Sequence, residues 1–94
     1  MIRHVSVFTL KAGADLTQID AGLDAVRDLV PGIVASAYGR DLGLRDGNGG
    51  YAASFDFTDE AAYREWDTHP EHQRVREELI LPNITAAQRA QFRL

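Results

Sequence analysis

The chain has 94 residues and a formal net charge of −4, and its basic residues are one lysine and nine scattered arginines. No basic stripe follows any predicted helix, which argues against nucleic acid and anionic membranes as partners. The chain has no cysteine, so disulfides, thiolate nucleophiles and zinc–thiolate sites are excluded, and we expect a cytoplasmic protein. We predict one domain over residues 1–94 with a small core, and neither a signal peptide nor a membrane span.

The first half of the chain predicts a strand, a helix and a second strand. Residues 2–10 alternate between two faces. One face carries Ile2, His4, Ser6, Phe8 and Leu10, and the other carries Val5 and Val7. Asp15 can cap a helix whose apolar positions recur every three or four residues from Leu16 to Val30, where Pro31-Gly32 ends it. Residues 33–40 then form a strand. Val34, Ser36 and Tyr38 alternate in it against Ile33, Ala35 and Ala37.

The second half predicts a strand, a broken helix and a last strand. The glycine-rich segment 39–50 is interpreted as a turn, because a phosphate-binding loop would lead into a helix and not into the strand 51–57. Tyr51, Ala53, Phe55 and Phe57 share one face of that strand. Asp59 can cap a helix that buries Ala62, Tyr63 and Trp66, and Pro70 starts a new segment whose apolar stripe continues to Ile80. Residues 86–93 are a weak candidate for the fourth strand.

The order βαββαβ is typical of an α+β protein in which both helices cover one face of an antiparallel four-stranded sheet. The uncovered face would carry small and apolar side chains, which a soluble chain does not leave open to water. They are Val5, Val7, Ala35, Ala37 and Ala52. We therefore predict a homodimer formed through this sheet face.

The segment His69-Pro70-Glu71-His72 holds the main candidate for chemistry. Pro70 places His72 in the first turn of a helix, where the positive end of the helix dipole disfavours an imidazolium ion. A neutral His72 is a candidate general base, although it is equally explained as an ordinary first-turn residue. His69 is interpreted as a cap of the new segment. The histidine pair would need a third ligand, such as His4, Asp67 or Glu71, to bind a metal, and we predict no metal site.

Strand alternation brings further polar and aromatic side chains to the face that His72 is expected to meet. As a substrate-binding set we predict His4, Ser6, Phe8, Tyr38, Phe55 and Trp66, with Tyr51 as a second catalytic residue. Such an aromatic lining with a few convergent polar groups is typical of a small-molecule site, here for a small aromatic or polyketide-like ligand. The alternative is that the aromatic residues only fill the core.

Four segments of the chain resemble the stress-responsive dimeric α/β-barrel family, the Dabb domain. They are Ile2–Lys11, Gly39-Arg40-Asp41, Gly49-Gly50-Tyr51 and His69-Pro70-Glu71-His72. The resemblance implies a ferredoxin-like protomer whose sheet closes into an α/β barrel with that of a second copy. It also implies a relation in fold to antibiotic-biosynthesis monooxygenases. Most members of the family have no established reaction, so the resemblance leaves the reaction unassigned.

One plant member of that family closes a linear polyketide by aldol chemistry without a cofactor. Its catalytic histidine matches His72 and a pocket histidine matches His4, but Trp66 stands where that enzyme has its catalytic tyrosine. An indole donates a hydrogen bond but does not exchange a proton as a phenol does. If the chain is an enzyme, we expect cofactor-free proton abstraction with His72 as base and Tyr51 or His4 polarising the carbonyl oxygen. The alternatives are a cofactor-free quinol-type monooxygenase and a binding or protective dimer.

Overall fold

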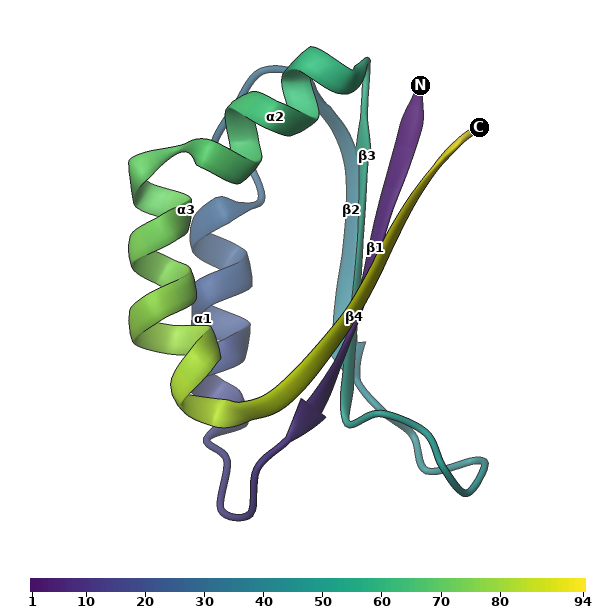
Figure 1. Cartoon of the computed structure of the whole chain (residues 1–94), viewed down its shortest axis with the longest axis vertical. Coiled ribbons are helices and arrows are strands. Elements are labelled where there is room, and N and C mark those ends of the chain that lie inside the picture. Colours follow the sequence, from purple (N-terminus) through teal and green to yellow (C-terminus); the bar gives the residue numbers. More distant parts are fainter.

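A computed structural model describes all residues from 1 to 94 and shows one antiparallel sheet covered on one face by helices (Figure 1). The strands lie in the order β2-β3-β1-β4. In chain order the elements are β1 (Ile2–Leu10), α1 (Leu16–Val26), β2 (Ile33–Arg40), β3 (Tyr51–Phe57), α2 (Glu60–Thr68), α3 (Pro70–Val75), the π-helical turn η1 (Arg76–Ile80), the 3-10 turn η2 (Leu81–Asn83) and β4 (Ile84–Arg93). The predicted βαββαβ order is confirmed.

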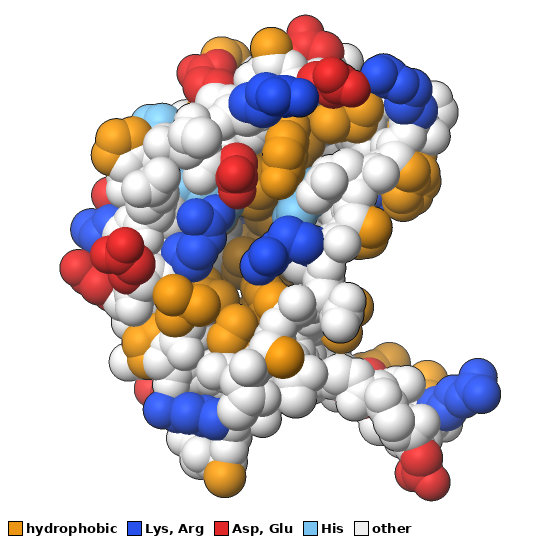
Figure 2. Space-filling model, viewed as in Figure 1, with side chains coloured by type: hydrophobic (Ala, Val, Ile, Leu, Met, Phe, Trp, Pro, Cys, Tyr) orange, Lys and Arg blue, Asp and Glu red, His pale blue; other side chains and the backbone are white.

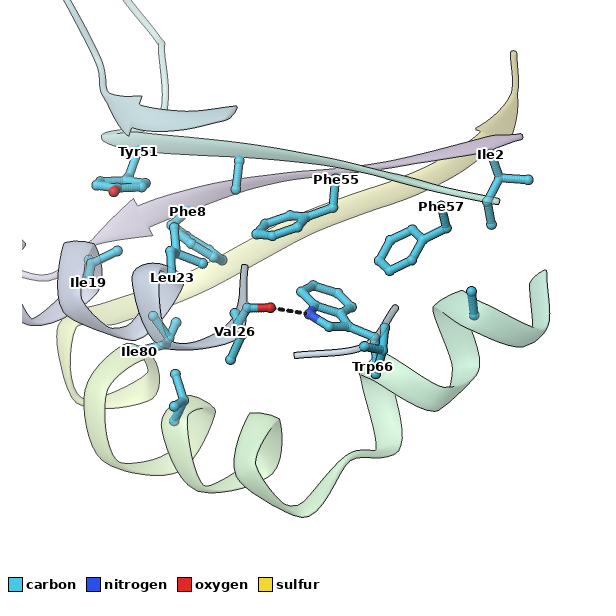
Figure 3. Packing of buried hydrophobic residues seen from close by; sticks show 14 residues of the cluster. Ile2, Phe8, Ile19, Leu23, Val26, Tyr51, Phe55, Phe57, Trp66 and Ile80 are labelled. Carbon is cyan, nitrogen blue, oxygen red and sulfur yellow. Dashed lines mark hydrogen bonds between the residues drawn. The ribbon is translucent and has the colours of Figure 1, made fainter. Parts of the chain in front are cut away.

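The core lies between the sheet and the helices (Figure 3). The predicted alternation of β1 is confirmed, because Ile2, His4, Ser6 and Phe8 are buried while Val7 is 41% exposed. In β3 the side chains of Tyr51, Ala53, Phe55 and Phe57 are buried on the same side. The sheet therefore turns one apolar row, that of β3, and one mixed polar and apolar row, that of β1, toward the helices.

Local hydrogen bonds explain where the helices begin. A side-chain oxygen of Asp15 accepts from the backbone N–H of Thr17 at 3.0 Å, and one of Asp59 accepts from that of Ala62 at 2.8 Å. The chain then breaks at His69, whose Nδ1 accepts from the N–H of Glu71 at 3.1 Å, and Pro70 opens α3. These side chains satisfy N–H groups that the first turn of a helix leaves free. The three predicted caps are confirmed.

Two element boundaries, and the faces of two residues in β2, differ from the sequence-based prediction. Helix α1 ends at Val26, because the Val26 carbonyl accepts from Leu29 in a tight turn and from the Trp66 indole, although Val30 remains buried. A bulge in β2 lets Ile33 pack on the core and leaves Val34 49% exposed, which reverses the predicted faces of these two residues. Strand β4 begins at Ile84, two residues before the predicted start.

The face of the sheet opposite the helices is open in this single chain. The small and apolar side chains predicted there lie on it, and Phe92 of β4, 50% exposed, extends the apolar surface. The segment 41–50 projects from the ends of β2 and β3 toward this open side (Figure 1). No helix in the chain has the length and apolar character needed to cross a membrane.

Candidate functional site

A cavity of about 70 Å³ lies between β1, β3 and β4 on one side and the helical layer on the other. Apolar side chains form most of its wall, and the polar atoms come from a few residues. Its lining consists of His4, Ser6, Phe8, Ala53, Phe55, Ile84 and Arg89 from the sheet, and Leu23, Val26, Trp66, Asp67, His72, Val75, Arg76, Ile80 and Leu81 from the other layer. In Figure 2 a hollow with hydrophobic and histidine side chains inside has Lys or Arg side chains at its rim.

The cavity opens beside β4 because this strand lies at the edge of the sheet. From Ala87 to Arg93 alternate residues of β4 face the same side as the β1 residues that they pair with, and Arg89 pairs with Ser6 while Gln91 pairs with His4. The side chain of Arg89 is exposed, so it reaches the cavity from the solvent side. The inner wall is thus apolar and the mouth is charged.

His72 is held as a neutral histidine with a defined tautomer. Its Nδ1 lies 2.9 Å from the backbone carbonyl oxygen of Trp66, and because a carbonyl only accepts, Nδ1 carries the proton. Nε2 then bears the lone pair and forms no hydrogen bond within the chain. Since every fully enclosed side-chain N or O atom has a partner, Nε2 is accessible to solvent, and His72 lines the cavity. Burial lowers the pKa of His72 below the usual 6.5, so the ring is neutral at pH 7.

His4 is the second neutral histidine of the cavity, with the opposite tautomer. The side-chain amide of Gln91 donates to His4 Nδ1 at 2.9 Å, which places the His4 proton on Nε2. Burial, followed by the positive charge of Arg89, lowers the pKa of His4 to about 4. The site therefore holds one imidazole with a free lone pair, His72, and one with a free N–H, His4.

Trp66 holds the two imidazoles in place and does not supply a proton. Its ring centroid lies 4.0 Å from that of His72 and 5.7 Å from that of His4. Its indole N–H donates to the Val26 carbonyl at 2.9 Å, in the interior (Figure 3). Because this is its only polar group, Trp66 forms a wall of the cavity and cannot replace a catalytic phenol.

The structure does not bring Tyr51 and Tyr38 into the cavity. The Tyr51 hydroxyl donates to Asp20 of α1 at 2.7 Å, and the Tyr38 hydroxyl donates to Asp24 of the same helix. Tyr51 lies at the Ile19 end of the core, away from Trp66 (Figure 3). Burial and the Asp20 carboxylate raise the pKa of Tyr51, which makes it a poor acid. The predicted set His4, Ser6, Phe8, Phe55, Trp66 and His72 does come together.

Three polar residues at or beside the cavity were not predicted from the sequence: Arg76 and Arg89 line it, and Gln91 binds His4. Tyr63, expected on the buried side of its helix, lies beside His4 with ring centroids 5.2 Å apart. Arg76 pairs with Asp67 at 2.9 Å at the rim. The alternation of β4 against β1 would have placed Arg89 and Gln91, had the register been known. No group of three or more His, Cys, Asp or Glu side chains lies close enough to hold a metal ion.

The antiparallel sheet with strand order β2-β3-β1-β4 and a one-sided helical layer defines the ferredoxin-like class of fold. The model of the Dabb family, described as the stress responsive A/B barrel domain, matches residues 2–92. The chain therefore belongs to the Dabb family. No curated protein matches the chain.

Solved structures agree over nearly the whole chain. A dimeric ferredoxin-like protein of unknown function from Thermobifida fusca has a TM-score of 0.87 and 28% identity, covering 99% of this chain and 90% of that one. Hydroxynitrile lyase from Passiflora edulis has a TM-score of 0.79 and 19% identity, with 97% and 90% covered. SnoaB, a cofactor-independent oxygenase from Streptomyces nogalater, has a TM-score of 0.77 and 19% identity, with 99% and 91% covered. At 19% identity these two likenesses establish the fold, and the reaction of this chain is unassigned.

Proposed function

We propose that this protein is a homodimer that binds a small aromatic or polyketide-like ligand and removes a proton from a carbon next to its carbonyl group, without a cofactor. The observation that carries the proposal is the pair of opposite tautomers. His72 offers the lone pair of Nε2, and His4 offers the N–H of Nε2, to the same apolar cavity.

The reaction needs only these two groups. His72 Nε2 takes the proton of the acidic C–H bond, and the electron pair of that bond moves to the carbonyl oxygen. His4 Nε2–H donates a hydrogen bond to the enolate oxygen that forms. His72 then returns its proton to carbon. In the ring-closing branch of a cyclase, the enolate carbon instead attacks a second carbonyl of the same ligand, the π electrons of that carbonyl move to its oxygen, and His72 gives its proton to the alkoxide that forms. In this scheme His4 takes the role for which Tyr51 was the other candidate.

Two alternatives use the same cavity differently. In a cofactor-independent oxygenase, the carbanion formed by His72 would react with dioxygen, and the aromatic lining suits a phenolic substrate. In a binding or protective protein, His72 would only begin α3 and support Trp66. Dioxygen uptake with aromatic polyphenols would identify the oxygenase. The exchange experiment described next distinguishes the binding protein from the proposed enzyme.

The homodimer is supported by the open face of the sheet. Three of the similar ferredoxin-like structures, from Thermobifida fusca, Jannaschia and Bacteroides fragilis, are described as dimeric. In this chain the face opposite the cavity carries small and apolar side chains that a second sheet can approach closely. Packing of two such faces would form the α/β barrel and leave both cavities on the outside of it.

Hydrogen–deuterium exchange tests the proposed base. Phenylacetone and related aromatic ketones are incubated in D₂O at pD 7, and loss of the α-hydrogen signals is followed by proton NMR. We expect the protein to accelerate exchange, and His72→Ala to reduce the protein-dependent rate about 10²-fold or more, because a positioned base contributes that much. His69→Asn is the matched control, since Asn retains the cap of α3 and the variant removes a histidine outside the cavity.

Circular dichroism verifies that His72→Ala is folded. Exchange at the buffer rate with the wild-type protein, across the whole set of ketones, would contradict proton abstraction. An unchanged rate in folded His72→Ala would contradict the role of His72 and favour the binding protein.

A further inference from the structure

Arg89 stands out among the nine arginines because it reaches a cavity without an acidic partner. Six arginines pair with carboxylates: Arg3, Arg27, Arg40, Arg74, Arg76 and Arg93. Of the others, Arg45 and Arg64 lie outside the cavity, and only Arg89 lines it. Its guanidinium makes no hydrogen bond in the chain, so all of its donors are free for a ligand.

The charges at the mouth leave one positive charge uncompensated. Asp67 is the only acidic residue of the lining, and it is already bound by Arg76 at 2.9 Å. His4 and His72 are neutral at pH 7 and add no charge of their own. A chain of net charge −4 thus places a free cation at the opening of an apolar cavity. An anion can gain there both a charge-assisted hydrogen bond and burial of its apolar part.

Resting on the proposed function, we propose that the cavity selects small aromatic carboxylates, with Arg89 as the group that binds the carboxylate. A guanidinium presents two parallel N–H groups that match the two oxygens of a carboxylate. The aromatic ring would lie inward, against Phe8, Phe55 and Trp66. Arg89 determines specificity in this arrangement and takes no part in proton transfer.

The size and composition of the cavity favour a carboxylate over a larger anion. Its volume of about 70 Å³ is small against the roughly 300–1,000 Å³ of sites for drug-sized ligands. The N-terminus of α3, which could otherwise help to bind a phosphate, is already capped by His69. Because about 70 Å³ is less than the roughly 150 Å³ of a cavity that takes up benzene, a one-ring acid would enter the apolar interior only in part and keep its carboxylate at the open mouth, beside Arg89.

The single tryptophan of the chain allows binding to be measured directly. Trp66 lines the cavity, so its fluorescence reports on a ligand that enters. Benzoate and benzamide are titrated as probes, because they share size and shape and differ in charge. We expect the wild-type protein to bind benzoate about tenfold or more tightly than benzamide, as charge-assisted hydrogen bonds imply. Arg89→Gln should remove the preference, whereas Arg93→Gln should keep it.

Arg93 is the matched control because it lies on β4, is exposed, and pairs with Glu60 outside the cavity. Equal affinity of the wild-type protein for benzoate and benzamide would overturn the proposal, as would the absence of saturable quenching by benzoate. A preference that survives in Arg89→Gln would also overturn it. Folded His72→Ala should keep the benzoate preference while losing proton exchange, so failure of anion binding and failure of the proposed catalysis give different results.

Discussion

At the scale of single residues, the burial of His4 makes the stability of the protein depend on pH. The side chain is 6% exposed and its pKa is lowered to about 4, whereas an unfolded histidine titrates near 6.5. Between these values the unfolded chain binds the proton and the folded chain does not. The free energy of unfolding should therefore fall as the pH decreases from 6.5 to 4, by up to about 3 kcal/mol from this residue.

Urea unfolding at pH 7.0 and pH 4.5 measures this effect. His4→Gln should reduce the difference in unfolding free energy between the two pH values. Some difference should remain, because burial lowers the pKa of His72 in the same direction. If the unfolding free energies of wild type and His4→Gln change by the same amount with pH, His4 is not the source.

The candidate site shows what sequence reasoning can and cannot find at this scale. Period-two alternation placed His4, Ser6 and Phe8 on the cavity side, and the proline after His69 placed His72 at the start of a helix. Alternation failed to exclude Tyr51, because a strand face does not reveal which end of it the cavity occupies. It missed Arg89 because the register of β4 against β1 depends on contacts far apart in the sequence.

At the scale of elements, Asn83 joins three of them. This residue is 3% exposed, and its side-chain oxygen accepts from the N–H of Asp15 at 2.9 Å. Its amide donates to the Leu79 carbonyl and to Gln18, both at 2.9 Å. Its backbone carbonyl accepts from the N–H of Lys11 at 3.1 Å. Through these hydrogen bonds Asn83 connects the end of η1, the start of α1 and the end of β1.

Asn83→Ala should destabilise the protein by about 2–4 kcal/mol, because it leaves the Asp15 N–H and the Leu79 carbonyl without partners. The matched control is Asn48→Ala in the segment 41–50, where the exposed amide donates to Asp41 at 3.0 Å. That variant should lose about 0.5 kcal/mol or less. Chemical denaturation measures both, and equal losses would show that the hydrogen bonds of Asn83 do not join the elements.

The boundaries of the elements fall into two groups, those that the sequence predicts and those that it does not. Helix starts were predictable, since Asp15, Asp59 and His69 act on N–H groups two or three residues away. The end of α1 was not, because the Val26 carbonyl binds an indole 40 residues later in the chain. The bulge at Val34 likewise follows from pairing with β3. The sequence therefore predicts the boundaries that depend on neighbouring residues, and it does not predict those that depend on residues far along the chain.

At the scale of the whole molecule, the cavity and the surface proposed for assembly lie on opposite faces of the sheet. The helices and the cavity lie on one side of the sheet, and the segment 41–50 projects toward the other (Figure 1). Leu42 and Leu44 in this segment are 81% and 84% exposed. Together with the open sheet face they form an apolar surface that a second copy would cover in the proposed homodimer.

Val7→Lys tests this arrangement, because Val7 lies on an interior strand of the open face and is 41% exposed. An unpaired charge is costly to bury, so we expect the dimer to weaken about 10²-fold or more and to dissociate at micromolar concentration. Sedimentation velocity measures the association. Gln73→Lys, which adds the same charge on the exposed side of α3, should leave the dimer unchanged. A wild-type monomer, or a Val7→Lys dimer of undiminished stability, would contradict assembly through this face.

The same variant also separates assembly from binding. Because the described lining residues lie on the helical side of the sheet, opposite Val7, monomeric Val7→Lys should retain the preference for benzoate over benzamide. Retention would mean that each protomer carries a complete site and that the dimer serves to cover the open face. Loss of the preference in a folded monomer would mean that the second copy shapes the cavity through the sheet, which makes the barrel part of the binding site.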